Sequence, residues 1–206
     1  MSQQSVLAGL IGRGIQASRT PALHEREGDA QSLRYLYRLI DADQLGLDDS
    51  ALPGLLDAAQ RTGFTGLNIT YPFKQAILPL LDELSDEARG IGAVNTVVLK
   101  DGKRVGHNTD CLGFAEGFRR GLADVPRAHV VQMGAGGAGA AVAHALLGEG
   151  VEHLVLFEAD AARGQALVDN LNQHFGPGRA RLGTDLPTAL AMADGLVNTT
   201  PVGMAK

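Results

Sequence analysis

Apolar positions in residues 1–107 alternate between short runs and helical spacing, which is typical of an α/β fold. Short runs rich in apolar and β-branched side chains favour strands, whereas apolar residues three and four positions apart favour helices. Asp101 and Gly102 separate the last two runs and favour a hairpin, so we expect an antiparallel part of the sheet there. The pattern predicts strands at 6–11, 33–41, 66–70, 93–99 and 104–108, and helices at 21–30, 50–62 and 73–84.

In residues 123–206, a short apolar strand and a helix follow one another repeatedly. The pattern predicts strands at 129–133, 153–158, 179–182 and 196–198, and helices at 138–148, 161–174 and 187–193. Strands joined through such helices pair in parallel by right-handed crossovers. We therefore expect two domains, an α/β domain at 1–107 and a Rossmann-type doubly wound domain at 123–206, with a linking helix at 108–122. Because a complete doubly wound sheet has further strands, the C-terminal part of this domain is expected to be absent from the given chain.

Composition excludes several classes of protein. The 206 residues include 18 Lys and Arg against 23 Asp and Glu, a net charge of -5, whereas a general nucleic-acid binder normally carries a basic face. No apolar run approaches the ~18 residues of a membrane span, and no basic segment leads into one at the N-terminus, so we expect a cytoplasmic protein. Cys111 is the only cysteine, which rules out an internal disulfide or a multi-cysteine zinc site, and no metal site is predicted. The 27 glycines, about twice the usual share, predict many tight turns.

The strongest local signal follows the predicted strand at 129–133. Gly134, Gly136 and Gly139 fit the GxGxxG pattern, in which the glycines allow a tight turn, the approach of a pyrophosphate and close packing of helix on strand. The N-terminus of the next helix then faces the phosphates. A structural glycine turn without a ligand is the alternative. The pattern predicts a dinucleotide site formed by Gly134, Ala135, Gly136, Gly137, Ala138 and Gly139.

Glu158 ends the next strand, 19 residues after Gly139, where a carboxylate can bond the ribose hydroxyls of a dinucleotide. A 2′-phosphate would require a basic group at this point, whereas Glu158 and Asp160 are both acidic. NAD is therefore expected as the cofactor, and NADP is disfavoured. Arg163, in the first turn of the following helix, is the contrary sign, and its alternative role is pairing with Asp160.

Polar residues in the first domain gather near predicted strand ends, where α/β sheets bind ligands. Asn68, Thr70 and Lys74 surround the end of the strand at 66–70, and a lysine there can bind a hydroxyl and, if partly desolvated, exchange its proton. The alternative for Lys74 is an ordinary solvated residue at a helix start. Asn95 lies at another strand end.

Three further residues are candidates with a capping alternative. Asp110 precedes the linking helix and could be its N-cap, with Asn108 or Thr109 as competitors. The hydroxyls of Ser18 and Thr20, in the loop before the first helix, suit a small carboxylate, and they could equally cap that helix.

These segments, taken in order, resemble the shikimate dehydrogenase family. The resemblance is carried by GLIG at 9–12, SRTPALH at 18–24, NITYPFK at 68–74, GAVNT at 92–96, GHNTD at 106–110, GAGGAG at 134–139 and NTTPVGM at 198–204. Several short motifs in this order are more specific than any one of them. The resemblance implies a two-domain enzyme that moves hydride between a nicotinamide cofactor and a ring hydroxyl of shikimate.

The resemblance also implies residue roles. By position, Ser18 and Thr20 hold the substrate carboxylate, Thr70, Asn95 and Asp110 bind ring hydroxyls, and Lys74 with Asp110 forms the catalytic pair. The nucleotide site comprises the glycine turn, Glu158, Arg163, Thr199 and Pro201. The remaining partner expectations are a small-molecule substrate, no nucleic acid, no membrane, and a monomer or homodimer.

Two details indicate a branch of the family. Biosynthetic members use NADP and carry Ser-x-Ser in the first loop and an arginine-containing loop after the second nucleotide-domain strand. This chain has Ser18-x-Thr20 and Glu158-Ala159-Asp160, which resembles the quinate/shikimate dehydrogenases that use NAD. The family continues beyond residue 204 to a substrate-contacting glutamine and a C-terminal helix, which the given sequence lacks.

Two alternatives stay open at this point. A catalytically silent family member could bind a ring acid or a nucleotide as a regulatory module, although the presence of both Lys74 and Asp110 favours an enzyme. A dehydrogenase for a related cyclic hydroxy acid, such as aminoshikimate, would use the same pocket residues.

Overall fold

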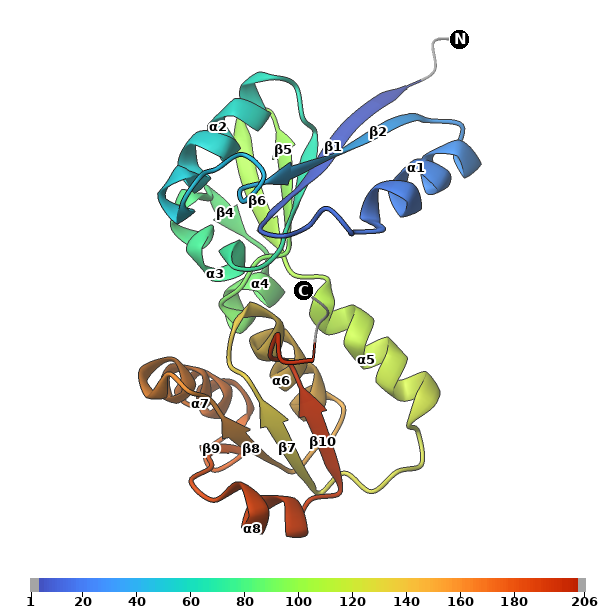
Figure 1. Cartoon of the computed structure of the whole chain (residues 1–206). Helices are drawn as coiled ribbons and strands as arrows, with labels where there is room; N and C mark the ends of the chain where they lie inside the picture. Colours follow the sequence, from blue (N-terminus) through green and yellow to red (C-terminus); the bar gives the residue numbers. More distant parts are fainter. Residues whose placement is uncertain (1–3, 204–206) are drawn as a thin grey trace. The chain divides into compact units, whose positions relative to one another are not determined.

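The computed structural model describes residues 4–203 and divides into two compact units (Figure 1). The first unit contains the residues up to 88 and 94–107, and the second contains 89–93 and the residues from 108 onward. Met204, the end of the motif segment 198–204, lies outside the described residues. Each unit has its own sheet and its own apolar core, so the α/β fold class is confirmed.

The first unit is built on a six-stranded mixed sheet in the order β2-β1-β3-β5-β6-β4. Parallel pairing joins β1 to β2 and β3, whereas β5 pairs antiparallel with β3 and β6, as the hairpin signal predicts. Its strands are β1 (Ser5–Gly12), β2 (Arg34–Asp41), β3 (Gly66–Ile69), β4 (Glu83–Leu84), β5 (Thr96–Lys100) and β6 (Lys103–His107). Its helices are α1 (Thr20–Ala30), α2 (Leu52–Arg61) and α3 (Phe73–Ala76), with 3-10 turns η1 (Asp49–Ala51) and η2 (Leu78–Leu80).

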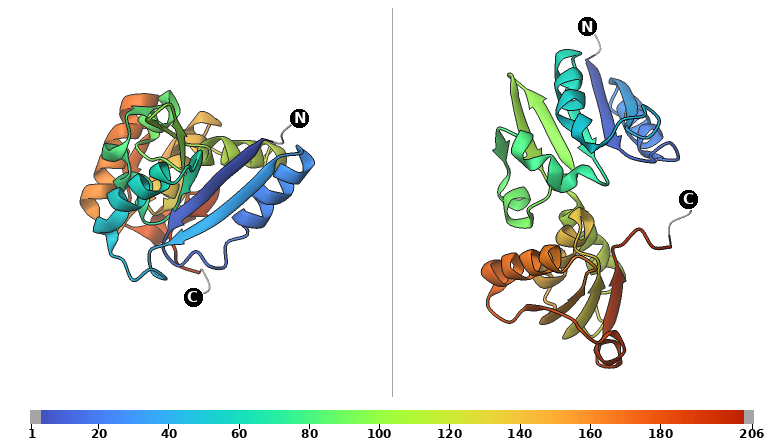
Figure 2. Two further views of the ribbon diagram at one scale, coloured as in Figure 1. Left: turned by 90° about the horizontal axis from the view of Figure 1, so that it is seen from above. Right: turned by 60° about the vertical axis from the view of Figure 1, so that its left-hand side comes forward.

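Alternation along β1 divides its side chains between two apolar clusters. Ile11 joins the larger core, in which Leu56 of α2 and Val97 of β5 are fully buried. Ala8 and Leu10, which point to the opposite face, pack with Tyr37 of β2 in a smaller cluster. The left view of Figure 2 shows α1 lying along β1 and β2. The sheet therefore buries apolar residues on both of its faces.

The second unit is a four-stranded parallel sheet in the order β10-β7-β8-β9, so the predicted parallel pairing is confirmed. Its strands are β7 (His129–Met133), β8 (His153–Phe157), β9 (Ala180–Leu182) and β10 (Gly195–Asn198). Its helices are α5 (Asp110–Gly121), α6 (Gly137–Gly148), α7 (Ala161–Phe175) and α8 (Leu186–Ala191), and α4 (Asp86–Ile91) spans the unit boundary. The chain runs outward from β7 to β9 and then returns to the other side of β7. Ligands of doubly wound sheets bind at such a reversal point.

The predicted helix at 73–84 is wrong beyond its first turn. Helix α3 ends at Ala76 and the 3-10 turn η2 follows, because Pro79 has no N–H to donate and its ring clashes with the carbonyl four residues earlier. Glu83 and Leu84 instead form β4, paired with β6. Ile77 is fully buried, and Leu81 and Leu84 pack against the same core. The apolar spacing therefore predicted which residues face the core, but not the type of secondary structure.

No helix in the part of the chain that the structure describes is long and apolar enough to cross a membrane.

Candidate functional site

Ser18 lies in the loop between β1 and α1, and Thr20, predicted in that loop, is the first residue of α1; their hydroxyls are side by side. Ser18 Oγ and Thr20 Oγ1 are 2.8 Å apart, and the Thr20 N–H donates to Ser18 Oγ at 3.2 Å. Neither hydroxyl caps α1 through its second or third N–H, since Arg19 occupies the N-cap position without a side-chain cap bond. Two adjacent hydroxyls can together meet both oxygens of a carboxylate.

Asp41, at the end of β2, anchors this loop. Its Oδ1 accepts from the N–H groups of Gly14 and Asp43, and its Oδ2 accepts from the Ile15 N–H and from Gln16 Nε2. Burial raises the pKa of the Asp41 carboxyl, but the bonds from Gln16, Ile15, Gly14 and Asp43 outweigh it and lower this pKa below its ordinary value. The carboxylate thus shapes the start of the loop that carries Ser18.

Thr70, Lys74 and Asn95 are brought together at the carboxyl end of β3. The Ile69 N–H donates to the Asn95 carbonyl at 2.8 Å, and the Val94 N–H donates to the Lys74 carbonyl at 2.8 Å. These two bonds hold residues 94–95 between the end of β3 and the start of α3. Asn95 is buried, whereas Thr70 and Lys74 are half-buried.

The same strand end also meets β1. The Thr70 N–H donates to the Ile11 carbonyl and the Arg13 N–H to the Tyr71 carbonyl, both at 3.0 Å. A Cβ on Gly12 would lie 2.4 Å from Thr70 Cγ2, so this close approach requires glycine. The loop bearing Ser18 and Thr20 therefore starts at the strand pair that carries Thr70.

Asp110 is the first residue of α5 in the second unit, one position after Thr109, the N-cap residue. Asn108 Oδ1 accepts from the N–H groups of Asp110 and Cys111, at 3.1 and 3.4 Å, while Asn108 Nδ2 donates to the Ala93 carbonyl. The side-chain capping bonds to the first N–H groups of α5 thus come from Asn108. The pairing of Asp110 with Lys74 stays a prediction.

The glycine turn between β7 and α6 has the geometry that a dinucleotide site requires. Gly134 adopts φ +99°, and a Cβ on Gly139 would lie 2.4 Å from the Gly134 carbonyl oxygen. The space that a Cβ on Gly136 would fill is open within 4 Å. The first and third glycines thus serve the turn and the packing, and the second leaves room for a ligand at the N-terminus of α6. The residues present fit a dinucleotide.

Two polar side chains hold this turn from beneath. Thr199 Oγ1, just after β10, donates to the carbonyls of Met133 and Gly134 at 2.8 and 3.1 Å. Gln132 is fully buried, and its Nε2 donates to the carbonyls of Gly134 and Gly139, both at 2.9 Å. Thr199 thus shapes the turn, and Pro201 is exposed in the segment that follows.

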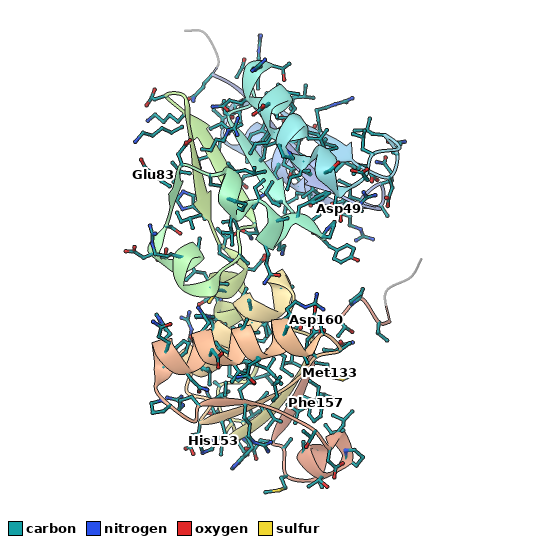
Figure 3. The ribbon with its side chains drawn as sticks, turned by 90° about the vertical axis from the view of Figure 1, so that its left-hand side faces the viewer. Asp49, Glu83, Met133, His153, Phe157 and Asp160 are labelled. Carbon is teal, nitrogen blue, oxygen red and sulfur yellow. The ribbon has the colours of Figure 1, made fainter. Side chains whose placement is uncertain are left out.

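Glu158, the residue after β8, joins the turn to the next helix. Its Oε2 accepts from the Ala135 N–H at 2.7 Å, and its Oε1 accepts from Arg163 Nη2 at 2.7 Å and the Asp160 N–H at 3.0 Å. Burial raises the pKa of the Glu158 carboxyl, but these bonds outweigh it and lower the pKa to about 2. Figure 3 labels Met133 and Phe157, the paired last residues of β7 and β8, and Asp160 at the start of α7.

The ion pair of Arg163 differs from the alternative considered from the sequence. Its guanidinium pairs with Glu158, whereas Asp160 caps α7 by accepting from the Arg163 backbone N–H at 3.1 Å. An N-cap aspartate accepts from the backbone N–H three positions later, and this is the bond that Asp160 forms here. The side chain of Arg163 then reaches the carboxylate at the strand end.

Sequence reasoning missed two residues that shape the site. Asp41 ends a strand next to a loop with Gly14, and a buried carboxylate among loop N–H groups is visible only in the fold. Gln132 is a polar residue in an otherwise apolar strand, VVQM, and this break in the pattern is the signal that could have found it.

Comparison with known proteins finds similarity along the whole chain. The profile of the shikimate dehydrogenase substrate binding domain matches residues 10–97. A shikimate dehydrogenase (NADP(+)) of Streptomyces avermitilis is 56% identical over 100% of this chain and 71% of its own length. A quinate/shikimate dehydrogenase (NAD(+)) of Corynebacterium efficiens is 52% identical over 99% of this chain and 73% of its own length.

Among solved structures, quinate dehydrogenase from Corynebacterium glutamicum in complex with NAD matches with a TM-score of 0.87 and 48% identity. The match covers 97% of this chain and 72% of that one. The resemblance stated from the motifs is therefore confirmed by sequence and by fold, and this chain belongs to the shikimate dehydrogenase family.

Proposed function

We propose that this protein is an NAD-dependent dehydrogenase that interconverts shikimate and 3-dehydroshikimate, or quinate and 3-dehydroquinate. The observation that carries the proposal is the gathering of Thr70, Lys74 and Asn95 at one strand end, beside the loop of Ser18 and Thr20. Relatives that are at least half identical carry shikimate or quinate/shikimate dehydrogenase names. The glycine turn at the reversal point of the second sheet supports a dinucleotide cofactor.

The residues of the first unit suit a ring acid with several hydroxyls. The paired hydroxyls of Ser18 and Thr20 would donate to the carboxylate, and Thr70 and Asn95 would bond the ring hydroxyls. These contacts would orient one secondary alcohol toward Lys74. Thr70 and Asn95 lie next to the ends of β3 and β5, and this position favours accurate placement of the substrate.

Lys74 would act as the general base. Oxidation of a secondary alcohol releases the hydroxyl proton and the hydride of the same carbon, and the Lys74 amine would take the proton. Asp110 would orient the lysine and bond the same hydroxyl. When bound, the nicotinamide supplies the hydride acceptor. In the reverse direction the lysine ammonium would return the proton to the carbonyl oxygen.

Glu158 supports NAD as the cofactor. A carboxylate with a pKa of about 2 is charged at every working pH, and it would accept from the adenosine ribose hydroxyls. A 2′-phosphate would meet this negative charge. Arg163, the cation beside the site, is already paired with Glu158.

NADP is the alternative cofactor, and several relatives with NADP(+) names support it. The Streptomyces avermitilis relative at 56% identity carries an NADP(+) name. To bind NADP, Arg163 would have to leave Glu158 and bond the phosphate, and Glu158 would have to turn away. The guanidinium is partly exposed, at 44% of its side chain, so such a change of partner is sterically possible.

The test is steady-state kinetics of both cofactors against shikimate and quinate, followed by the absorbance of the reduced nicotinamide. We expect NAD to be preferred by about ten-fold or more in kcat/KM, because a charge-assisted contact contributes ~1.5 to 3 kcal/mol. Glu158→Ala should narrow this ratio. Glu152→Ala, the same change at an exposed position of the second unit, is the matched control and should leave the ratio unchanged.

Two results would contradict the proposal at different levels. Equal or better kcat/KM with NADP would show that the cofactor assignment is wrong and leave the reaction standing. No turnover of either ring acid with either cofactor would refute the dehydrogenase function and favour a silent binding module.

A further inference from the structure

A chain of side-chain hydrogen bonds crosses the sheet of the first unit and ends on Asn95. The Tyr37 hydroxyl donates to Asn68 Oδ1 at 2.6 Å, and Asn68 Nδ2 donates to Thr96 Oγ1 at 3.1 Å. The Thr96 hydroxyl in turn donates to Asn95 Oδ1 at 3.0 Å. Each donor in this chain thus fixes the direction of the next bond.

Strand register explains how these residues meet. Asn68 and Thr96 are directly paired on the antiparallel strands β3 and β5, so their side chains share one face of the sheet. Tyr37 lies on β2, on the far side of β1, where its partner is Ala8. The phenol is long enough to pass over β1 and reach Asn68, whose own partner on β1 is Leu10.

The position of the Tyr37 ring is itself held by α1. Its centroid lies 4.5 Å from that of His24, and His24 Nδ1 is 3.0 Å from the Thr20 carbonyl oxygen. Tyr37 is 4% exposed, and this burial raises the pKa of its hydroxyl, which therefore stays protonated and able to donate. The chain thus begins beside the Ser18–Thr20 loop and ends at Asn95.

The chain sets the polarity of the Asn95 amide. An amide has one acceptor end and one donor end, and its two ends can exchange by a flip of the side chain. Because Asn95 Oδ1 receives the Thr96 hydroxyl, Nδ2 becomes the end that donates elsewhere. If Asn68 were free to flip, Thr96 could turn its hydroxyl toward Asn68, and Asn95 would lose this preference.

We infer that Tyr37 is a positioning residue: through Asn68 and Thr96 it holds the Asn95 amide with Nδ2 as the donor toward a ring hydroxyl of the substrate. This inference rests on the proposed function, in which Asn95 binds that hydroxyl. Tyr37 itself is not placed against substrate. Its effect is on the binding of the ring acid, not on proton transfer.

The first test is kinetic and uses matched substitutions. Tyr37→Phe and Thr96→Val each remove one hydroxyl of the chain with little change of shape, and each should raise KM for the ring acid about three- to ten-fold, the range of one buried hydrogen bond. Neither kcat nor KM for the cofactor should change by more than about two-fold, which is the error of such comparisons. Thr96→Ser, which keeps the hydroxyl, should restore the parent KM.

Tyr35→Phe is the control for the loss of a phenol hydroxyl. Tyr35 lies two positions earlier on β2 and takes no part in the chain within residues 4–203. It should behave as the parent protein does. In the double variant Tyr37→Phe with Thr96→Val, KM for the ring acid should rise by less than the product of the two single increases, because both substitutions act through Asn95.

A second readout needs no substrate. The Asn95 side-chain amide resonance in the nitrogen NMR spectrum, assigned by its absence in Asn95→Asp, should shift in Tyr37→Phe and Thr96→Val. It should stay in place in Thr96→Ser and Tyr35→Phe. If Tyr37→Phe fails to fold, the Thr96 pair still decides the question.

The outcomes separate the two proposals. An unmoved Asn95 resonance in Thr96→Val, or a Thr96→Ser variant as impaired as Thr96→Val, would overturn the role of the chain. Equal losses for the ring acid and the cofactor would also overturn it, since they would indicate general damage. If the parent protein turns over no ring acid, the proposed function is wrong, and the amide spectrum still decides whether Tyr37 orients Asn95.

Discussion

In Lys74, the backbone carbonyl forms a hydrogen bond within the fold, whereas the proposed chemistry uses the side-chain amine. The backbone carbonyl accepts from the Val94 N–H, which helps to keep Asn95 near the end of β3. The proposed proton transfer needs the side-chain amine. Because a substitution leaves the carbonyl in place, the chemical role can be tested without removing this contact.

Lys74→Ala should lower kcat by about 10² to 10⁴, the usual contribution of a general acid or base, with little change in cofactor affinity. Steady-state kinetics gives kcat, and calorimetry measures NAD binding separately. Gln75→Ala, at the exposed neighbouring position of α3, is the control and should keep kcat. If Lys74→Ala raises KM for the ring acid but keeps kcat, Lys74 is a binding residue. The search for the base would then turn to Asp110.

Glu158 is a nearly buried carboxylate, with 7% of its side chain exposed, and its charge is held by three donors. The donors are worth most when the carboxylate is ionised. Since the pKa of Glu158 falls from 4.5 to about 2 in the folded protein, the unfolded state binds a proton first as the pH is lowered. Its contribution to stability is therefore full above pH 4.5 and is lost toward pH 2.

Comparison with Glu158→Gln should expose this dependence. The parent protein should be more stable than the variant by about 3 kcal/mol near neutral pH, the equivalent of this shift in pKa. The difference should shrink as the pH falls from 4.5 to about 2. Urea unfolding at stepped pH measures it, and a difference that is constant across this range would contradict the assignment.

The loop between β1 and α1 is held by residues on a neighbouring strand rather than by its own sequence. Asp41 gathers the N–H groups at its start, and Arg13 pairs with Asp49 at 2.7 Å and donates to the Leu47 carbonyl at 2.7 Å. Arg13 also pairs with Asp43. The segment after β2 thus shapes the segment that presents Ser18 and Thr20.

Asp41→Asn should destabilise the protein by roughly 2 to 4 kcal/mol, because the new NH₂ group faces backbone donors that lose their buried acceptor. We also expect a higher KM for the ring acid, since the loop carries the proposed carboxylate contacts. Urea unfolding and kinetics test the two effects together. Asp29→Asn, at an exposed position of α1, is the control, and an Asp41→Asn variant as stable as this control would contradict the anchoring role.

Across the whole molecule, the proposed contacts to the substrate carboxylate and the proposed cofactor contacts belong to different compact units. Ser18 and Thr20 are in the first unit, and Glu158 and the glycine turn are in the second. Each unit has its own core, so a substitution in one is not expected to disturb the packing of the other.

Ser18→Ala and Thr20→Ala should each raise KM for the ring acid by about ten-fold or more, as one lost hydrogen bond to a charge is worth ~1.5 to 3 kcal/mol. KM for NAD should stay unchanged. Combining Ser18→Ala with Glu158→Ala should give the product of the single changes in kcat/KM, because independent sites add in free energy. If Ser18→Ala raises KM for NAD as much as KM for the ring acid, the Ser18 hydroxyl stabilises the fold and does not bind the substrate.

The sequence alone predicts the local features of this chain. Strand and helix periods, the hairpin at Asp101-Gly102 and the glycine turn depend on residues close together in the chain, and the structure confirms them, with the exception of the predicted helix at 73–84. The same holds for the parallel order of β7, β8 and β9, because a crossover helix leaves few other connections. Composition and periodicity therefore sufficed for the α/β class and for the position of the nucleotide turn.

Contacts between residues far apart in the sequence could not be predicted from local patterns. Tyr37 and Asn68 are 31 positions apart, Asp41 meets Gly14 across 27, and their meeting depends on the order and register of β2, β1 and β3. The choice of Arg163 between Glu158 and Asp160 depended likewise on where a strand end and a helix start come to lie. Local periodicity reports which residues are buried, but side-chain hydrogen bonds have short range, so only the folded sheet determines which buried polar groups become partners.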